Sequence, residues 1–580
     1  MIQQSIQSAT QLHEAGKLDE AEAVCREILA KEPGHADSLH LLGVILAQRR
    51  QFAPAIDLIR RAIAVRPAVA QYYSNLGLAL AQSGQPLAAA ACLRQVVAFQ
   101  PGNAAAFNQL GVLLHGVGQI DDGIAALTEA ARLRPEVARF HFDVGTAYLQ
   151  TGRTHRAIPH YREATRLEPK NAHYLYNLGA ALAECEKYPE ALEAFDKTIE
   201  LSPGDVRVHS NKGAVLHHLG RRPEALTSLR RAVELDPKFP NNYNNLGAIM
   251  EDEGKWPEAL DAYRKAIALN PDSALFHWNC ARALMALGQW EEGWEEFEWR
   301  LRAPRLGLNR NFTQPQWDGS DSAGKTILAH AEGGYGDALQ FVRFVPLVAQ
   351  RGAKMILECQ PGLAPLFEGM VGVAQVVPRG QPLPAFDWQI PLQSLPRIFG
   401  ITPRNIPNQV PYLSAPADRT QRWADRLAGG TKLRVGLVWS GAKNSQWDYR
   451  TRTIDAFSPL AGTPGVKFFS LQKGEASQQA PPTGMDWADF TSELNDFADT
   501  AALIHNLDLV VTVDTSTGHL AGAMGKAVWV LVPFKSDIRW LLDRPDTPWY
   551  PTMRLFRQPT ETDWQTPIRQ IAAALRGFTR

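Results

Sequence analysis

The chain has 580 residues, more than one hydrophobic core usually serves, so at least two domains are expected. Lysine plus arginine and aspartate plus glutamate number 60 each, and no basic stripe occurs, so we expect neither DNA nor RNA as a partner. The first residues lack the apolar core of a signal peptide, and no run of about eighteen apolar residues appears, which predicts a cytoplasmic protein without a membrane span. Five scattered cysteines without a C-x-x-C pair favour buried, reduced thiols over disulfides or zinc.

Residues 1–303 carry a repeat with a constant interval. Prolines stand 34 residues apart at Pro33, Pro67, Pro101, Pro135, Pro169, Pro203, Pro237 and Pro271, and glycines and small residues keep the same step. Within each copy, apolar residues recur at helical spacing on both sides of a Gly-containing turn, which predicts a helix hairpin. The unit resembles the tetratricopeptide repeat. This resemblance implies an α-solenoid of about nine hairpins, wound into a superhelix with a concave protein-docking groove.

Polar residues occupy two further registers of the repeat. His141, His209 and His277 share a phase with aromatic residues, so we expect packing between helices and assign no metal. The position two residues before the periodic glycine carries amides and one acid: Asn75, Gln109, Asp143, Asn177, Asn211, Asn245 and Asn279. Such amides hold an extended polypeptide in the long-repeat O-GlcNAc transferases that this register resembles, which makes the asparagines candidate contacts for an acceptor protein. Hydrogen bonds to neighbouring helices are an equally open alternative.

The pattern changes after the ninth copy. Residues 304–325 are predicted to be a linker rich in Gly, Pro and Asp. From Thr326 onward, short β-like runs alternate with helical stretches, which is typical of βαβ units and parallel sheets. Two such lobes are expected, at 326–418 and 430–580. The predicted fold class is therefore an α-solenoid followed by an α/β domain of two Rossmann-like lobes, whose ligands would bind beyond the carboxyl ends of the strands.

Residues 319–326 match the phosphate-binding loop G-x-x-x-x-G-K-T of ATPases. A working loop of this kind follows a strand and opens a helix. Here polar, turn-forming residues precede Gly324, and the residues after Thr326 are predicted to form a strand. We therefore interpret the match as chance and expect no ATPase.

Two other segments place polar side chains directly after predicted strands. In AEGGYGDALQF, residues 331–341, a Gly-rich turn leads to a helix that presents Asp337, and Leu339 replaces the third glycine of a dinucleotide fingerprint. In the second lobe, an apolar run ends at a series of small polar residues that begin a helix, namely Asp514, Thr515, Ser516, Thr517, Gly518 and His519. Hydroxyls and free amides at a helix N-terminus suit a diphosphate. Taken singly, the acids and Ser516 could simply cap helices, and His519 could be a buried imidazole.

These segments, together with LRVGLVWSG, FFSLQKG and DFADTAALI, resemble the heptosyltransferase-type glycosyltransferase domain of GT-B fold. That domain occurs in bacterial proteins with N-terminal tetratricopeptide repeats, some of which glycosylate proteins, flagellin included. The resemblance covers about residues 315–575. It implies that Asp337 is the catalytic base and that Asp514 to His519 bind the phosphates of the donor. Members of the family often read E-Q-G-x-G-D, whereas Gly333 stands here in place of the glutamine.

Further candidates for donor binding lie at the ends of two strands in the second lobe: Trp439, Ser440, Gly441, Arg452, Gln472 and Lys473. The two cations could stabilise the charge of the leaving group, although solvated surface charges are the alternative. Trp439 could equally be core. Because no D-x-D tripeptide is present, we expect no metal and no cofactor besides the nucleotide-sugar substrate.

The predicted reaction is inverting transfer of a sugar from a nucleotide donor to a Ser or Thr hydroxyl of a protein docked on the repeats, with flagellin as a candidate. Asp337 would accept the hydroxyl proton. Two alternatives remain open: a non-catalytic protein-binding adaptor with a decayed transferase domain, for which Gly333 is the best support, and a heptosyltransferase acting on a glycan or lipid core. The sequence leaves the sugar, the acceptor and the oligomeric state undefined, with ADP-heptose, UDP-N-acetylhexosamine and CMP-nonulosonate all open as donors.

Overall fold

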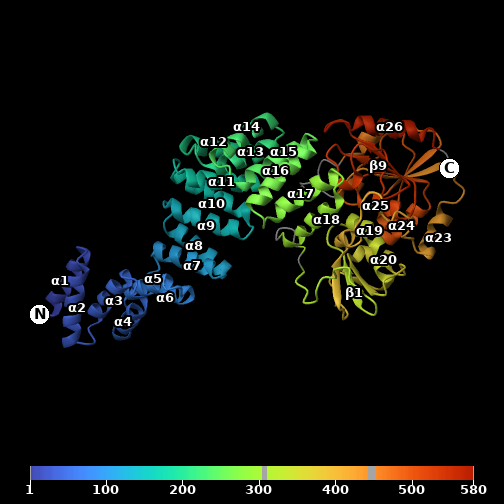
Figure 1. Ribbon diagram of the computed structural model, residues 1–580. Coiled ribbons are helices and arrows are strands. Elements are labelled where there is room, and N and C mark those ends of the chain that lie inside the picture. The colour runs from blue at the N-terminus through green and yellow to red at the C-terminus, as the bar shows by residue number, and fades with distance from the viewer. Residues whose placement is uncertain (1, 304–307, 309, 442–451, 579–580) are drawn as a thin grey trace. The chain divides into compact units, whose positions relative to one another are not determined.

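The computed structural model describes residues 2–303, 308, 310–441 and 452–578 (Figure 1). The chain forms two compact units, Met1–Asn245 and Leu246–Arg580, which are taken in turn. The division falls within a helix of the repeat region, whereas the repeat pattern itself continues to about residue 303.

The first unit consists of antiparallel helix hairpins that follow one another in chain order (Figure 1). Its helices are α1 Ile2–Glu14, α2 Leu18–Lys31, α3 Ala36–Gln48, α4 Phe52–Val65, α5 Ala70–Gln82, α6 Pro86–Phe99, α7 Ala104–Gly116, α8 Ile120–Leu133, α9 Ala138–Gln150, α10 Thr154–Leu167, α11 Ala172–Glu184, α12 Tyr188–Leu201, α13 Val206–His218, α14 Arg222–Leu235 and the first part of α15 Pro240–Asp252. The predicted hairpins are thus confirmed.

The periodic glycines lie where the two helices of a hairpin touch. A Cβ added at Gly145 would lie 2.8 Å from the ring of Tyr161, and one at Gly179 would lie 2.6 Å from the ring of Phe195. A larger residue would push the helices apart, because a packed interior has no room for extra atoms. The 34-residue glycine register therefore reflects close helix packing.

The histidine register has a structural role that the sequence did not specify. Nε2 of His141 lies 3.1 Å from the carbonyl oxygen of Pro135, and Nε2 of His209 lies 3.0 Å from that of Pro203. The hydroxyl of Tyr243, in the same register, donates to the Pro237 oxygen at 3.0 Å. Each of these side chains thus bonds to the carbonyl of the proline in the turn that separates its helix from the preceding hairpin.

All five cysteines are free, and Cys25, Cys92, Cys280 and Cys359 are buried. Burial raises the pKa of the Cys25 thiol to about 11 and that of the Cys359 thiol to about 12. Thiols with such a raised pKa stay protonated and unreactive at neutral pH. The prediction of buried thiols holds for these four, and Cys185 is half-buried.

The second unit begins with the last repeats and continues into two parallel sheets. Its repeat helices after α15 are α16 Trp256–Leu269, α17 Ala274–Ala286 and α18 Trp290–Phe297, extended by the 3-10 helix η1 Glu298–Arg302. With these, the described residues form nine hairpins, from α1 to α18. Residues Pro304 to Gly307 and Asn309, in the predicted linker, lie outside the described residues.

The first sheet has four parallel strands in the order β3-β2-β1-β4, and Ile327 of β1 pairs with Met355 of β2 and Trp388 of β4. Its strands are β1 Thr326–His330, β2 Lys354–Cys359, β3 Val373–Pro378 and β4 Trp388–Pro391. The helical segments between and after them are α19 Tyr335–Phe341, η3 Val342–Phe344, α20 Val345–Ala349, η4 Pro361–Leu363, α21 Ala364–Phe367, η5 Leu392–Ser394 and α22 Leu395–Ile398. All four strands were predicted.

The second sheet has six parallel strands in the order β10-β9-β8-β5-β6-β7. Its strands are β5 Leu433–Val438, β6 Val466–Ser470, β7 Trp487–Asp489, β8 Leu509–Val513, β9 Val528–Val532 and β10 Met553–Arg557. The helical segments of this part are α23 Ala417–Arg426, η7 Ile454–Leu460, η8 Glu475–Gln478, η9 Thr491–Glu493, α24 Phe497–His505, α25 Ser516–Ala523, η10 Ile538–Trp540 and α26 Gln565–Leu575. The sequence did not predict the edge strands β7 and β10, because β7 is only three residues long and arginines interrupt the apolar residues of β10.

Tryptophans of the last repeat pack into the core that both sheets share. The ring of Trp290 stacks on that of Trp549 at 6.2 Å, and Nε1 of Trp294 donates to the carbonyl oxygen of Ile401 at 2.9 Å. Both tryptophans are buried, at 3% and 5% exposure. This packing explains why the last repeats belong to the same compact unit as the sheets.

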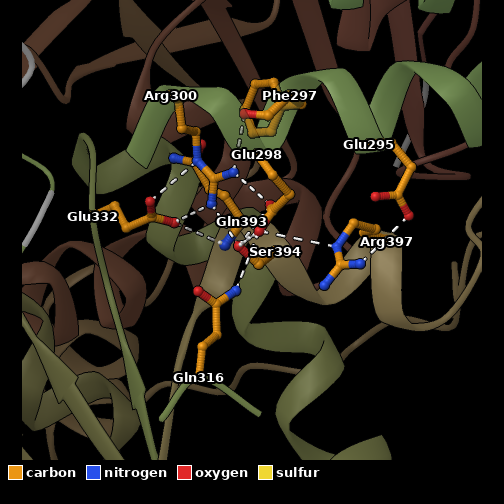
Figure 2. Close-up of polar contacts among 9 residues, drawn as sticks. All are labelled: Glu295, Phe297, Glu298, Arg300, Gln316, Glu332, Gln393, Ser394 and Arg397. Carbon is orange, nitrogen blue, oxygen red and sulfur yellow. Dashed lines mark hydrogen bonds and ion pairs between the residues drawn. The ribbon is translucent and has the colours of Figure 1, made fainter. Parts of the chain in front are cut away.

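A buried charged cluster ties η1 to the first sheet (Figure 2). The guanidinium of Arg300 donates to both carboxylate oxygens of Glu332, at 3.1 and 2.9 Å, and to Oγ of Ser394 at 2.8 Å. It also donates to Oε1 of Glu298 at 2.7 Å and to the Phe297 carbonyl at 3.3 Å. Burial raises the pKa of Glu332, although Arg300 opposes this effect. The turn after β1 is thereby held against the end of the repeats.

Among the described residues, no helix combines the length and the apolar character needed to cross a bilayer.

Candidate functional site

The order of the strands identifies one edge of each sheet as a place for ligands. In the first sheet, β1 lies between β2 and β4, and in the second sheet β5 lies between β6 and β8. Chain connections leave such a central strand in opposite directions, which opens a crevice beyond the carboxyl ends of the strands. The turn that contains Gly333 follows β1, whereas Ser440 follows β5 and Asp514 follows β8.

Asp337 lies in the first turn of α19, directly after the Gly-rich turn. Its Oδ2 accepts a hydrogen bond from the backbone N–H of Gly334 at 3.1 Å, and its Oδ1 accepts one from Nη2 of Arg539 at 2.9 Å. The side chain of Asp337 is 23% exposed. The carboxylate therefore caps its helix, as the simpler interpretation expected, and at the same time faces the second sheet.

The residues from Asp514 to His519 form the corner between β8 and α25. Asp514 is buried at 6% exposure, and the hydroxyls of Thr512 and Thr515 lie 2.9 Å apart. His519 is buried at 2% exposure, with Nδ1 3.0 Å from the hydroxyl of Tyr550. In the first turn of α25 the N–H of Gly518 donates to the Thr515 carbonyl at 3.0 Å, whereas helix geometry gives those of Ser516 and Thr517 no partner within the helix, which makes this corner chemically suited to an anion.

The starts of α19 and α25 lie against each other. A Cβ added at Gly336 would lie 2.9 Å from Cδ2 of His519 and 3.7 Å from Cα of Ser516. Two segments that the sequence placed on separate sheets therefore share one location, and the contact requires a glycine in α19. The carboxylate of Asp337 is in the same turn as this contact.

Arg539 was not predicted as a site residue, yet it contacts most of this corner. It lies in η10, after β9, so its signal in the sequence was a D-x-R tripeptide beyond a strand end. Besides Asp337, it donates to Oε1 of Gln340 at 2.9 Å and to Oδ1 of Asp537 at 3.0 Å, and its Nη1 lies 3.5 Å from Nε2 of His519. Burial alone would raise the pKa of Asp537, but the Arg539 guanidinium outweighs burial and holds that pKa below its ordinary value.

A cavity of about 550 Å³ opens at the carboxyl ends of β5 and β6. It is lined by Ser440, Arg452, Thr453, Ala456, Glu475, Ala476 and Gln479. Ser440 and Arg452 were predicted donor contacts, whereas Glu475 and Gln479 were not. The volume and the mixture of polar and apolar groups suit part of a small-molecule ligand.

Three other predicted donor contacts do not line this cavity but bond to groups of the protein itself. Oε1 of Gln472 accepts the backbone N–H groups of Trp439 and Ser440 at 3.0 and 2.8 Å, and Gln472 is buried. Trp439 is fully buried core, with Nε1 donating to Gln479 at 3.0 Å. Nζ of Lys473 donates to the carbonyl oxygens of Thr491 and Leu494, at 2.7 and 2.9 Å.

Gly441 is half-buried, next to Ser440 at the end of β5. The guanidinium of Arg452 lies over the ring of Trp564 at 4.5 Å. Residues Ala442 to Thr451, which connect the two, lie outside the described residues.

The asparagines predicted to contact an acceptor are half-buried and hydrogen-bonded within the repeats. Nδ2 of Asn75 lies 2.8 Å from Nε2 of His40, and Nδ2 of Asn211 donates to the Tyr176 hydroxyl at 3.2 Å. Each of these bonds joins neighbouring hairpins, as does that of Asn245 to Ser210. Asn177 instead donates to the backbone of its own helix, at 2.7 Å, and Asn279 is half-buried in α17. Their role in acceptor binding stays a prediction.

The space that a side chain at Gly333 would need is occupied. A Cβ there would lie 2.6 Å from Oδ2 of Asp337 and 3.0 Å from Nε2 of Gln393. In this chain the amide of Gln393, from the turn after β4, thus approaches the position from which a glutamine at 333 would extend.

The apparent phosphate-binding loop does not have the geometry of one. Gly319 and Gly324 adopt positive φ angles of 96° and 71°, and β1 starts at Thr326, so a strand follows the motif in place of a helix. Lys325 is 49% exposed, with Nζ 3.9 Å from Asp387. The described residues also contain no cluster of His, Cys, Asp or Glu arranged to hold a metal ion.

Models of the tetratricopeptide repeat match most of the N-terminal part. The matched residues are 12–76, 70–103, 108–166, 145–206, 216–254 and 251–288. The N-terminal part of the chain therefore carries tetratricopeptide repeats, a class of repeat that binds peptides and proteins.

This chain is similar to Protein FlbA of Caulobacter vibrioides, with 28% identity over 315 residues. The match covers 50% of this chain and 52% of FlbA, so the chain spans about half the length of this relative. Among solved structures, MamA is 25% identical, with 29% of this chain and 92% of MamA covered at a TM-score of 0.28. YrrB, described as a TPR protein with an unusual peptide-binding site, is 24% identical, with 32% and 96% covered and a TM-score of 0.29.

Proposed function

We propose that the chain is a glycosyltransferase that moves a sugar from a nucleotide donor to a hydroxyl of a protein bound by its repeats. The observation that carries this proposal is the contact between the starts of α19 and α25, which puts the carboxylate of Asp337 beside an anion-binding corner. Asp337 and the start of α25 each lie beyond the carboxyl ends of the strands of a parallel sheet, where ligands of such folds bind. The two sheets would then be the lobes of a GT-B fold.

In the proposed reaction Asp337 accepts the proton of a Ser or Thr hydroxyl on the acceptor. The hydroxyl oxygen forms a bond to the anomeric carbon of the donor sugar as the bond from that carbon to the nucleotide phosphate breaks. The nucleoside diphosphate, or CMP in the case of a CMP-nonulosonate, leaves with the electron pair, and the configuration at the anomeric carbon is inverted. Asp337 suits the role of base because its carboxylate is partly exposed and its Oδ2 is held by the backbone N–H of Gly334.

The donor would lie along the second sheet. The N-terminus of α25, from Thr515 to Gly518, would stabilise the negative charge of the diphosphate through its backbone N–H groups. The cavity bounded by Ser440, Arg452 and Glu475 would hold the nucleoside, because it offers both a carboxylate and a guanidinium for polar groups. No metal is required in this scheme.

The repeats would supply the acceptor. Tetratricopeptide repeats bind peptides and proteins, and the last of them pack against the sheets through Trp290 and Trp294. A polypeptide held by the repeats would therefore be tethered to the same unit as Asp337, which raises its effective concentration at the site. We place the reaction in the cytoplasm and name flagellin as the first acceptor to try.

The first experiment identifies the donor. Thermal melting of the full chain with ADP-heptose, UDP-N-acetylglucosamine and a CMP-nonulosonate should show stabilisation by one of them, about 2.7 kcal/mol at a ligand concentration 100 times the Kd. The second is co-expression with flagellin, followed by intact mass measurement of the flagellin. A mass increase equal to one or more sugars is expected with the wild-type chain, none with Asp337→Asn, and an unchanged increase with the exposed control Asp425→Asn.

The adaptor hypothesis makes the opposite prediction. An adaptor with a decayed site would bind its protein partner, but no nucleotide sugar would raise its melting temperature. Failure of the whole donor panel would therefore refute the transferase proposal in favour of the adaptor. The occupied space beside Gly333 is the observation that keeps this alternative worth testing.

A further inference from the structure

Arg539 joins the two sheets at the candidate site through an ion pair. Its Nη2 donates to Oδ1 of Asp337 at 2.9 Å, while the same guanidinium reaches Asp537 and Gln340. The side chains of Arg539 and Asp337 are 21% and 23% exposed, so water or a ligand can reach the pair. The mechanism proposed above assigns no task to this residue.

The charges around Arg539 do not balance. Three carboxylates, those of Asp337, Asp537 and Asp514, act on this one guanidinium and raise the pKa of Arg539 against the effect of burial. A nucleoside diphosphate that enters the corner at α25 adds further negative charge. Its repulsion by Asp337 and Asp514 has to be offset by a nearby cation.

Other described cations near the second sheet's carboxyl edge are engaged elsewhere. Nζ of Lys473 donates to two carbonyl oxygens, and the guanidinium of Arg452 lies over Trp564 beside the cavity. Arg539 borders α25 directly, with Nη1 3.5 Å from Nε2 of His519. It is thus the described cation best placed to contact a diphosphate at the first turn of that helix.

The backbone beside Arg539 is strained. Leu541, two residues further on, has φ 54° and ψ 179°, and Asp543 has φ 50°. A positive φ is unfavourable for a leucine, whereas aspartate adopts it more readily, so the strain lies at Leu541. Strain of this kind is found in segments that change conformation or hold a functional group in place.

We propose that Arg539 is a positioning residue with two alternative anionic partners: the carboxylate of Asp337 in the donor-free chain, and the diphosphate of the nucleotide donor at the start of α25. This inference rests on the proposed transferase function. When the donor binds, Arg539 turns from Asp337 to the diphosphate, which leaves one oxygen of Asp337 open to the acceptor hydroxyl. Arg539 thereby makes the base available only when a donor is present.

The test measures binding of nucleoside diphosphates to the full chain. Calorimetric titration with ADP, UDP, GDP and CDP first identifies the diphosphate that wild type binds. The same titration is then repeated with Arg539→Gln, Arg539→Lys, Asp337→Asn and the double variant Arg539→Gln/Asp337→Asn. Arg569→Gln, which removes an exposed arginine from α26, is the matched control. Thermal melting of each variant checks that it folds.

We expect Arg539→Gln to raise the Kd by about tenfold or more, since it removes a charge-assisted hydrogen bond to phosphate. Arg539→Lys should fall between wild type and Arg539→Gln. Asp337→Asn should lower the Kd by about threefold, because the competing ion pair is lost. In the double variant, compared with Arg539→Gln alone, that gain should be smaller, because only the repulsion between Asp337 and the diphosphate is then relieved. If Arg539 had only a structural role, the gain would be the same with and without it.

The outcomes separate the two proposals. If wild type binds a diphosphate but Arg539→Gln binds it equally well, the inference is wrong and the transferase proposal stands. The inference is also wrong if Asp337→Asn weakens binding or if the gain is as large in the double variant as with Arg539 present. If wild type binds none of the four diphosphates, the inference fails, and the transferase proposal fails with it unless the CMP-nonulosonate, whose leaving group is a nucleoside monophosphate, raises the melting temperature.

Discussion

Replacing Arg300 by methionine should destabilise the second unit more than any exposed substitution in the same helix. The variant keeps the length of the side chain but removes all its hydrogen-bond donors. In the structure these donors reach Glu332, Glu298, Ser394 and the carbonyl of Phe297 (Figure 2). The side chains of Arg300 and Glu332 are each 1% exposed, so water cannot take over the lost bonds.

The size of the effect follows from the charge that remains. Once Arg300 is gone, the Glu332 carboxylate keeps its hydrogen bond from the backbone N–H of Gln393, 3.3 Å away. Removing one partner of a buried ion pair lowers the free energy of unfolding by about 3–5 kcal/mol. At about 2 °C per kcal/mol for a large domain, the melting temperature of this unit should fall by at least about 6 °C.

The loss should depend on pH in a defined direction. Burial raises the pKa of Glu332 even in wild type, so this carboxyl contributes most to stability below its unfolded pKa, and the contribution is lost as the pH rises through the folded value. Without Arg300 the folded pKa rises further, and Glu332 can be buried as a neutral acid at moderately low pH. The gap in melting temperature between wild type and Arg300→Met should therefore be smaller at pH 5 than at pH 8.

Tryptophan fluorescence is a suitable assay because all 15 tryptophans lie at or beyond Trp256, in the second unit. Arg302→Met, an exposed arginine of the same η1 helix, is the matched control and should change the melting temperature by little. Equal effects of Arg300→Met and Arg302→Met, or a gap that widens toward pH 5, would refute the reasoning.

Three further predictions concern other parts of the chain. Both amide atoms of the fully buried Asn242 have no hydrogen-bond partner, so Asn242→Val should stabilise the fold by about 1–3 kcal/mol in denaturant unfolding, and a loss of stability would contradict this. Gly336→Ala should lower the melting temperature and weaken nucleotide-sugar binding, because its Cβ would lie 2.9 Å from His519, whereas Gly334→Ala, with 3.9 Å to its nearest neighbour, should be tolerated. Similar effects of the two glycine variants would disprove the close contact. Purified wild type should not hydrolyse ATP, and turnover that disappears in Lys325→Ala would overturn the interpretation of the loop as a chance match.

Local patterns in the sequence predicted most of the secondary structure. The 34-residue register predicted the hairpins, since each proline and glycine acts on helix ends and contacts within one copy. Apolar runs predicted β1 and β8, because both faces of a central parallel strand are buried. The edge strand β10 escaped prediction because its arginines interrupt the apolar run, and hydrogen bonding to β9 decides its conformation.

The candidate site was predictable only in pieces. Asp337 and the corner at Asp514 could be predicted because each follows a strand end, where parallel sheets bind ligands. The functions expected of Gln472 and Lys473 depended on where their side chains point. The structure turns Gln472 toward the backbone at the end of β5 and Lys473 toward the backbone carbonyls of Thr491 and Leu494, after β7. The signal of Arg539 in the sequence was weak, a D-x-R tripeptide after β9.

The sequence by itself determined the repeat, the two parallel sheets and the strand ends that carry polar residues, because these properties arise from interactions between residues close together in the chain. The tertiary structure alone decided that Asp337 meets Arg539, 202 residues away, and that Gly336 packs against His519. Such contacts depend on how the two sheets pack on each other and on the last repeat. That packing is the sum of many weak apolar contacts, and no single motif encodes it.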